Sequence, residues 1–350
     1  MNSRERILAA IAGNPHDRVP VAQHNFAFCV RHAGITMGAY RREPELAARV
    51  LVDAAEEFGY DCIIIDFDTC SLAEAMGAQV EFPEDDMARV AQPLLDSIAD
   101  IRKLPLPDPN EDGRLPLWLE TTRAVRRMVG DRMAVMGRAD QGPFGLLFQL
   151  RGHENFMMDL LDEDESTILD ALDYCAEAGS RFASAQIDAG ADVTSIGDSA
   201  CGQSLISPAH YRQFGQPFQT AYRKRMGLGL LSLHICGKSN EIIEGMAVTG
   251  CEVLELDHLN DIALSIKKVA DRACIWGNIN PALLSQGSAD DVLAACRPVL
   301  ESAVKLTQKF VLCPGCLANA DVPATNIRAM TDAARRWGRY PNGSSGEAGQ

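Results

Sequence analysis

Residues 230–257 read LLSLHICGKSNEIIEGMAVTGCEVLELD, and this stretch carries the pattern that decides the fold. Residues 230–236 and 253–257 are short apolar runs of the length expected for buried strands. Residues 239–248 lie between them and have apolar side chains at helical spacing. A strand, a helix and a second strand in this order predict two parallel strands joined by a crossover helix.

The same alternation recurs along the chain. Six further strand-like runs are expected at residues 19–25, 62–67, 134–139, 193–197, 273–278 and 310–313. Further amphipathic segments are found at residues 43–58, 166–189, 208–226, 288–307 and 323–337. Apolar strands that alternate with helices indicate a parallel sheet buried on both faces. About eight such repeats predict an α/β fold, a single (β/α)8 TIM barrel over residues 1–340.

One long segment, residues 71–127, interrupts this alternation. Within it, residues 75–82 predict an added hairpin and the proline-rich residues 104–113 predict a surface loop. We therefore expect a hairpin and loop insertion after the second strand rather than a second domain. Residues 341–350 are rich in Gly and Ser and are expected to form a disordered tail.

Composition and charge exclude several classes of protein. The chain has 350 residues, of which 47% are hydrophobic, and this is enough for a sizeable core. A formal net charge of -15 argues against binding to nucleic acid or to an anionic membrane. No segment approaches the roughly 20 uninterrupted apolar residues that span a bilayer, and the N-terminus has no apolar signal sequence. These features predict a soluble cytoplasmic protein.

The eleven cysteines are scattered and odd in number, which does not suggest a disulfide framework. Eight of them are expected to be reduced thiols that serve as small core residues, namely Cys29, Cys62, Cys70, Cys175, Cys201, Cys251, Cys274 and Cys296.

His234 and Cys236 form a His-x-Cys pair at the end of one predicted strand. Residues i and i+2 of an extended chain face the same way, so both side chains can bind one ion, and zinc accepts both ligand types. Residues 313–316 read Cys-Pro-Gly-Cys and offer a third thiolate from Cys313 or Cys316. Three protein ligands leave the fourth zinc position open, which marks a reactive site. A redox dithiol, a closed site with both cysteines, and a core histidine beside a core thiol are the alternatives.

Nearly every predicted strand ends in polar residues, and in a barrel of this kind the strand ends carry the chemistry. Besides His234 and the cysteines, these residues are His24, Asn25, Asp66, Asp68, Arg138, Asp140, Asp198, Ser199, Asp257, His258, Asn278 and Asn280. Helix capping is the alternative role, in particular for Asp257 and Asn280. A thiol that enters the open position of zinc loses its proton and can attack an electrophilic carbon, so the expected reaction is alkyl transfer. Asp68 and Asp198 are the expected catalytic carboxylates, which orient the thiol carrier or tune the metal ligands.

Four motifs in the chain together resemble those of a known family. Residues 68–77 read DTCSLAEAMG, an aspartate after the second strand followed by the start of a hairpin. Residues 198–214 contain Asp-Ser and then Ile-Ser-Pro-Ala-His-Tyr-Arg-Gln-Phe, residues 277–281 read GNINP, and residues 314–316 read PGC. The combination is similar to the uroporphyrinogen decarboxylase superfamily and, within it, to the branch of corrinoid-dependent methyltransferases. The resemblance covers about residues 4–337 and implies a TIM barrel.

The two branches of that superfamily differ at the residues that carry their chemistry. Decarboxylases grip a polycarboxylate tetrapyrrole with an Arg-Gln-Ala-Gly-Arg motif, whereas this chain keeps Arg31 and has the apolar Ile35 in place of the second arginine. Decarboxylases also have a histidine where this chain has Cys316. The methyltransferase motif carries over to His234, Cys236 and Cys316 as the zinc ligands, and Cys313 is not expected from that pattern.

The resemblance implies a zinc-dependent methyltransferase that moves a methyl group between a corrinoid, as in methylcobalamin, and an acceptor, a thiol activated on zinc. No Asp-x-His-x-x-Gly cobalamin motif occurs, so we expect the corrinoid on a separate protein that docks at the barrel mouth. His24, Asn25, Asp66, Asp140 and Asn278 are the expected substrate-binding residues. Coenzyme M, homocysteine, another thiol and a folate are the candidate acceptors. A decarboxylase of uroporphyrinogen or a related tetrapyrrole, and a non-catalytic barrel that binds a metal or a corrinoid, are the two alternative functions.

Overall fold

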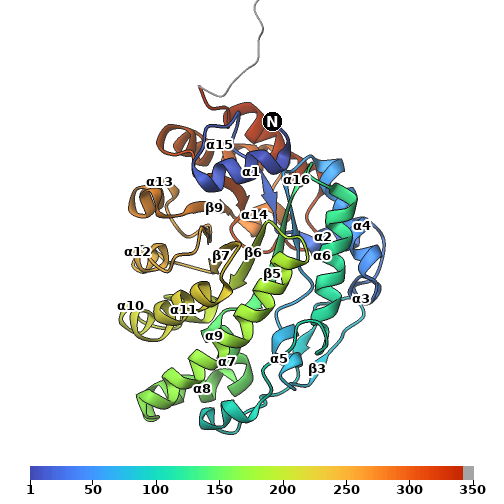
Figure 1. The fold of residues 1–350 in the computed structure, drawn as a ribbon. Coiled ribbons are helices and arrows are strands. Elements are labelled where there is room, and N and C mark those ends of the chain that lie inside the picture. Colours follow the sequence, from blue (N-terminus) through green and yellow to red (C-terminus); the bar gives the residue numbers. More distant parts are fainter. Residues whose placement is uncertain (342–350) are drawn as a thin grey trace, which may run out of the picture.

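The computed structural model describes residues 1–341, which form a barrel of eight parallel strands surrounded by helices (Figure 1). In chain order, which is also the order in the sheet, the strands are β1 (Ala22–Gln23), β2 (Cys62–Ile65), β5 (Ala134–Gln141), β6 (Val193–Gly197), β7 (Leu230–Ile235), β8 (Val253–Leu256), β9 (Cys274–Ile279) and β10 (Phe310–Pro314). Neighbouring strands pair in parallel, and a parallel bridge between Val21 and Leu312 joins β1 to β10. The predicted TIM barrel and its eight strands are therefore confirmed.

Helices cover the outside of the barrel. The longer ones are α4 (Pro44–Phe58), α6 (Leu115–Val129), α9 (Glu165–Asp188), α11 (Gln216–Met226), α15 (Ala289–Leu306) and α16 (Ala324–Trp337). The shorter ones are α2 (Phe26–His32), α3 (Met37–Arg42), α5 (Ser71–Ala75), α7 (Pro143–Arg151), α8 (His153–Asp162), α10 (Pro208–His210), α12 (Ile243–Ala247), α13 (Ile262–Val269) and α14 (Pro281–Gln286). Single turns of other helix types are η1 (Ile98–Lys103), η2 (Ser199–Cys201), η3 (Tyr211–Gly215) and η4 (Ala270–Arg272). The amphipathic segments of the sequence correspond to helices that pack on the sheet. Each such helix needs only one apolar face, which lies against the sheet, while its opposite face is polar.

Several helices lie outside the predicted set, and one of them, α1 (Ser3–Ala12), closes the amino-terminal end of the barrel. Asn2 and Glu5 form a capping box at its start. Ile7 and Ile11 of α1 pack with the inward-facing apolar side chains of the strands in one buried cluster. Figure 1 shows α1 at one end of the barrel and α5, α7, α8 and the β3 region at the other. One end of the barrel is therefore filled by packed side chains, and in TIM barrels the active site lies at the other end, where the strands have their carboxyl termini.

The insertion after β2 contains the predicted hairpin, formed by β3 (Val80–Glu81) and β4 (Arg89–Val90), which pair antiparallel. Its expected extent to residue 127 is wrong, because α6 begins at Leu115 and packs as the regular barrel helix between β2 and β5. The first strand is also shorter than the expected residues 19–25, since the backbone N–H of Val19 donates to the backbone oxygen of Gly338 at 2.8 Å and does not pair in the sheet. The predicted tail lies, apart from Pro341, outside the described residues.

The interior of the barrel changes from apolar to polar along its axis. The apolar layer next to α1 contains Cys62, Ile64, Ala134, Met136, Val193, Val253, Cys274, Trp276, Val311 and Cys313. Two residues further along the strands, the inward positions carry buried polar side chains, among them Asp66, Arg138, Ser195, Ser232 and Glu255. The polar layer marks the functional end of the barrel.

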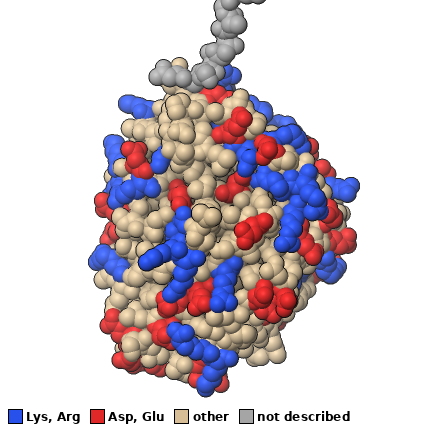
Figure 2. Space-filling model, viewed as in Figure 1, with Lys and Arg blue, Asp and Glu red and all other residues tan. Residues whose placement is uncertain are grey.

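The eight cysteines expected in the core are buried free thiols, as predicted. Among residues 1–341, no helix combines the length and the apolar character needed to cross a bilayer. On the face in Figure 2, basic and acidic side chains are interspersed, so this face has no large patch of negative charge.

Candidate metal centre

Three side chains meet at the carboxyl ends of β7 and β10. His234 lies in β7, Cys236 is the first residue after β7, and Cys316 lies two residues beyond the end of β10. Nε2 of His234 is 2.9 Å from Sγ of Cys236, and this sulfur is 3.3 Å from Sγ of Cys316. The three ligand atoms lie within 4.8 Å of one another, and no other such group of His, Cys, Asp or Glu occurs in residues 1–341.

The barrel strands orient the ligands from β7. His234 and Cys236 are two residues apart, so both point into the barrel mouth. The β7–β8 register pairs His234 with Glu255, and Nδ1 of His234 is 3.2 Å from the backbone oxygen of Glu255. Because a carbonyl oxygen only accepts, Nδ1 donates the hydrogen bond and Nε2 is left for a metal. The backbone N–H of Cys236 donates to Oγ of Ser199 at 3.1 Å.

A tight loop positions Cys316. A Cβ added to Gly315 would lie 2.5 Å from the backbone nitrogen of His258, so only glycine permits this close approach between the loops after β10 and β8. The backbone N–H of Ala318 donates to the backbone oxygen of His24 at 2.8 Å, which attaches the loop to the end of β1. Cys316 is therefore held from two sides.

The two thiols and the imidazole influence one another's ionisation. The hydrogen bond from Cys316 lowers the pKa of Cys236 to about 7 against the opposing effect of burial, and the charge on Arg138 acts in the same direction. The hydrogen bond to Cys236 and burial raise the pKa of Cys316 to about 11. Burial works to lower the pKa of His234, but the hydrogen bond and charge of Cys316 outweigh it and raise this pKa. A bound cation would replace the protons that the three groups share.

These three residues fit a zinc ion. Zinc binds sulfur at about 2.3 Å and imidazole nitrogen at about 2.0–2.1 Å, which in a tetrahedral site separates the ligand atoms by roughly 3.5–3.8 Å. The observed separations would reach these values by side-chain adjustments of less than about 1 Å. Two thiolates balance the charge of Zn²⁺, and three ligands leave one coordination position open.

Cys313, the alternative third thiol, lies elsewhere. It is 2% exposed and belongs to the apolar cluster inside the barrel, together with Trp276 and Val311. Burial raises the pKa of Cys313 well above its usual range, so a thiolate is disfavoured there. The structure brings Cys316, and not Cys313, to His234 and Cys236.

His24 and Asp66, two of the expected substrate-binding residues, lie at the ends of β1 and β2. Nε2 of His24 is 2.7 Å from Oδ2 of Asp66, and both side chains are buried. Oδ1 of Asp66 has no hydrogen-bond partner within the described residues. A buried carboxylate oxygen without a partner is an available acceptor for a ligand.

The two carboxylates expected to act in catalysis make extensive contacts within the protein. Asp68 forms an ion pair with Arg114, with 2.5 Å between Oδ2 and Nη1. Asp198 accepts hydrogen bonds from the backbone nitrogen of Gly145 at 2.7 Å and from the side-chain amide of Gln219 at 2.8 Å. Burial raises the pKa of Asp198 to about 6. Within the described residues neither carboxylate group forms a hydrogen bond to the side chains of the three metal ligands, whereas the backbone N–H of Asp198 donates to the backbone oxygen of His234 at 2.8 Å.

Asp140 combines burial, an unpartnered oxygen and an unusual backbone. Its φ is 61°, in the left-handed region. Oδ2 accepts a hydrogen bond from the backbone nitrogen of Leu72 at 2.7 Å, whereas Oδ1 is buried and has no partner among residues 1–341. Burial, with the charges of Asp68 and Asp66, raises the pKa of Asp140 to about 8. Residues with a strained backbone conformation often lie at functional positions.

The two expected asparagines have different surroundings. Nδ2 of Asn278 donates to the backbone oxygens of Asp257 and Asn260 at 3.1 and 2.8 Å, so this side chain joins the ends of β8 and β9. Asn25 precedes α2, and its Nδ2 is buried without a partner in the described chain. Asn280, for which capping was the alternative role, does cap α14.

Two further charged residues lie near the metal ligands: Arg138, which was expected at a strand end, and Glu255, which was not expected. Glu255 in β8 is the strand neighbour of His234, and Arg138 in β5 donates from Nη1 to Oγ of Ser195 at 3.2 Å. A signal for Glu255 was present in the sequence, because a charged residue two positions before Asp257 interrupts an apolar strand and is rarely buried without a role.

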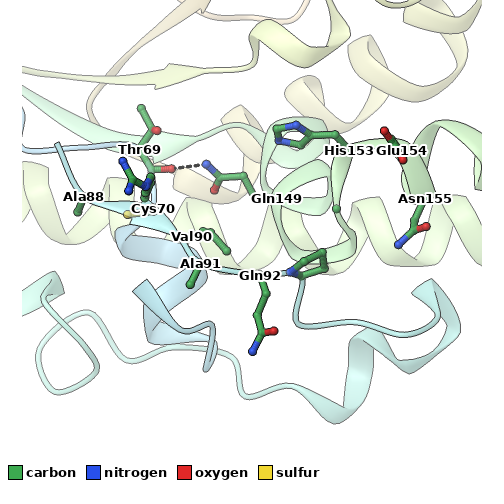
Figure 3. Close-up of a pocket in the computed structure, with 13 residues that line it drawn as sticks. Thr69, Cys70, Ala88, Val90, Ala91, Gln92, Gln149, His153, Glu154 and Asn155 are labelled. Carbon is green, nitrogen blue, oxygen red and sulfur yellow. Dashed lines mark hydrogen bonds between the residues drawn. The ribbon is translucent and has the colours of Figure 1, made fainter. Parts of the chain in front are cut away.

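A cleft of about 570 Å³ opens between the β3–β4 hairpin and helices α7 and α8 (Figure 3). Polar side chains line much of it, including Gln149 and His153, and Gln149 donates to the backbone oxygen of Thr69 at 2.7 Å. Thr69 follows Asp68 at the end of β2, so the cleft belongs to the rim of the barrel. None of the three metal ligands lines it.

Comparisons with known proteins identify the family. Residues 2–337 match the family model described as Uroporphyrinogen decarboxylase (URO-D). The chain is 31% identical to the methylcobamide:CoM methyltransferase MtaA of Methanosarcina barkeri, over 94% of this chain and 96% of that protein. It is 29% identical to the uroporphyrinogen decarboxylase of Thioalkalivibrio sulfidiphilus, over 85% of this chain and 88% of that one. The solved structure of a methyltransferase from Methanosarcina mazei matches with a TM-score of 0.88 and 26% identity, and covers 96% of this chain and 99% of that chain. The match to the family model over nearly the whole chain shows that this protein belongs to the uroporphyrinogen decarboxylase family.

Proposed function

We propose that this protein is a zinc-dependent methyltransferase that moves a methyl group between a corrinoid and an acceptor thiol. The observation that carries the proposal is the group formed by His234, Cys236 and Cys316, because soft donors with one open position suit a thiol substrate. Relatives named methylcobamide:CoM methyltransferases, 26% to 31% identical over most of the chain, support corrinoid-dependent methyl transfer.

His234, Cys236 and Cys316 would hold the ion. When bound, zinc lowers the pKa of a thiol at its open position and so supplies a nucleophilic sulfur at neutral pH. The residues of the chain then have the task of orienting the substrate. Asp66 offers the free oxygen Oδ1, with its other oxygen held by His24.

The remaining expected site residues take roles that follow from their contacts. We assign Asn25, Asp140 and Asn278 to the wall of the substrate site, the first two through buried polar atoms without partners. Asp68 and Asp198 act indirectly, since their bonds to Arg114 and Gln219 hold the ends of β2 and β6 in place.

The corrinoid is proposed to arrive on a separate protein that docks at the mouth of the barrel. Helix α1 closes the opposite end, so a large cofactor has access only from the end where the metal ligands lie. The cytoplasm is the proposed location, because buried free thiols suit a reducing compartment.

Cys316→Ala tests the proposal, with Cys313→Ala as the matched control. Zinc content and methyl transfer from methylcobalamin to candidate thiols are measured for both variants. The first variant is expected to lose zinc and activity together, and the second to keep both, because Cys313 faces the apolar interior. X-ray absorption at the zinc edge should show one additional sulfur ligand when the acceptor thiol is added. Full activity of a zinc-free variant would refute the mechanism, and turnover of uroporphyrinogen by metal-free protein would favour a decarboxylase.

A further inference from the structure

The polar layer of the barrel interior is a connected group of charged and hydroxyl side chains. Oγ of Ser195 and Oγ of Ser232 both donate to Oε1 of Glu255, at 2.5 and 2.6 Å. Ser195 in turn accepts the hydrogen bond from Arg138, whose Nε is 3.3 Å from Oδ2 of Asp66. All five side chains are buried. Two carboxylates and one guanidinium therefore share the interior, where each is at most 6% exposed.

Strand register places this group against the metal ligand His234. Glu255 is its direct partner in β8, and Gly197 is its direct partner in β6. A Cβ added to Gly197 would lie 2.5 Å from Nη2 of Arg138, so the guanidinium rests on the backbone of β6. His234 in β7 thus has Glu255 beside it in β8, and the guanidinium of Arg138 lies over the neighbouring strand on the other side, β6.

Packing alone does not account for these charges. Burying an ion pair costs more than filling the same space with apolar side chains of similar volume. The layer nearer α1 is filled in that apolar way, with Met136 and Val253 two residues before Arg138 and Glu255 in their strands. The change from apolar to charged residues occurs at the level where the metal ligands begin, which points to a role toward them.

We propose that Glu255 is a positioning residue for the metal centre and that Arg138 is its counter-ion. Its backbone oxygen fixes the ring of His234 through Nδ1, and its carboxylate, held by Ser195 and Ser232, places negative charge next to the cation. Arg138 offsets this charge and that of Asp66. The inference rests on the proposed function only in assuming that the three ligands bind a metal.

Glu255→Gln removes the charge and keeps the size of the side chain. Loss of such an outer partner typically weakens metal binding by about 10–100-fold, and this is the loss expected for zinc in competition with a chelator. The absorption bands of the Co²⁺-substituted protein should also shift, because the negative charge next to the cation is lost while the backbone contact to His234 is kept. Ser232→Ala, which removes one hydrogen bond to Glu255, should cause a smaller loss in the same direction.

Asp61→Asn is the matched control. Asp61 is also a fully buried carboxylate held by arginines, Arg6 and Arg18, but it lies at the amino-terminal end of the strands next to α1. This variant should lower the Tm without changing zinc affinity or the cobalt spectrum.

Three results would overturn the inference. Wild-type zinc affinity and an unchanged cobalt spectrum in Glu255→Gln would overturn it and leave the proposed function intact. An equal loss of zinc affinity in Asp61→Asn would show that general stability is being measured. A wild-type protein that binds no zinc would overturn both the inference and the proposed function.

Discussion

Replacing Asp140 with Asn should make the stability of this protein less dependent on pH. The side chain is fully buried, and one of its oxygens has no hydrogen-bond partner in the part of the chain that the structure describes. Burial, with the charges of Asp68 and Asp66, raises its pKa from 3.8 to about 8, while Arg114 acts in the opposite direction. Asn has nearly the same shape, tolerates the left-handed backbone at this position and does not ionise.

The sign and the size of the effect follow from linkage. In the unfolded chain the carboxyl group ionises near pH 4, whereas in the folded protein it keeps its proton up to about pH 8. The stability that depends on this proton is fully present below about pH 4 and is lost as the pH rises toward about 8. The slope is about 1.4 kcal/mol per pH unit, so the loss between about pH 5 and pH 7 is about 2.7 kcal/mol. With an unfolding entropy of about 2.1 cal/mol/K per residue, this corresponds to roughly 4 °C in Tm.

Calorimetric scans of both proteins at several pH values in this range test the argument. The Tm of Asp140→Asn relative to wild type should rise by roughly 4 °C as the pH increases over these two units. Asp131→Asn, at a side chain that is 86% exposed, should follow the wild-type curve. A constant difference in Tm between Asp140→Asn and wild type would mean that Asp140 is already ionised in the folded protein, and the reasoning would fail.

Three further substitutions test separate parts of the structure. Gly315→Ala places a Cβ 2.5 Å from the backbone nitrogen of His258, so it should displace the Cys316 loop and lower the zinc content; full zinc occupancy would show that the loop adapts. Ile7→Ala removes a fully buried side chain from α1 and should lower the free energy of unfolding in urea by about 2–5 kcal/mol without loss of zinc. A decrease of less than about 1 kcal/mol would mean that the packing of α1 against the end of the barrel contributes little to stability. Arg114→Met leaves Asp68 buried without its counter-charge and should cost about 3–5 kcal/mol in the same measurement, whereas wild-type stability would mean that the ion pair is dispensable.

The strands could be predicted well because a strand buried on both faces is mostly apolar, and this sets it apart from the half-polar helices. The predicted run at residues 193–197 coincides with β6, and that at residues 253–257 extends one residue beyond β8. The apolar pattern does not give the correct strand length where residues of an apolar run form their backbone hydrogen bonds outside the sheet. Val19 donates to the backbone oxygen of Gly338 instead of joining the sheet, so β1 is short.

Helix α1 escaped prediction for a related reason. Its polar residue Arg6 lies on the buried side, where ion pairs with Asp17 and Asp61 satisfy it. A helix that buries an arginine has no continuous apolar stripe, and it is stable only because acidic partners outside the helix pair with that arginine, Asp61 from 55 residues away in the chain.

By itself, the sequence determined the repeating pattern of the barrel and the pairing of His234 with Cys236, because both follow from the direction of side chains within one strand. The spacing alone left Cys313 and Cys316 open as the third thiol, the family resemblance implied Cys316, and the tertiary structure shows the physical reason for that choice. Cys313 is a strand residue that points into the apolar interior, whereas Cys316 lies in the loop beyond and reaches a sulfur 80 residues away in the chain. The same holds for Glu255, whose role depends on its neighbours in β6 and β7. The local sequence pattern predicts on which face of a strand a side chain lies. Which other side chains contact it depends on how the strands are arranged in the closed barrel.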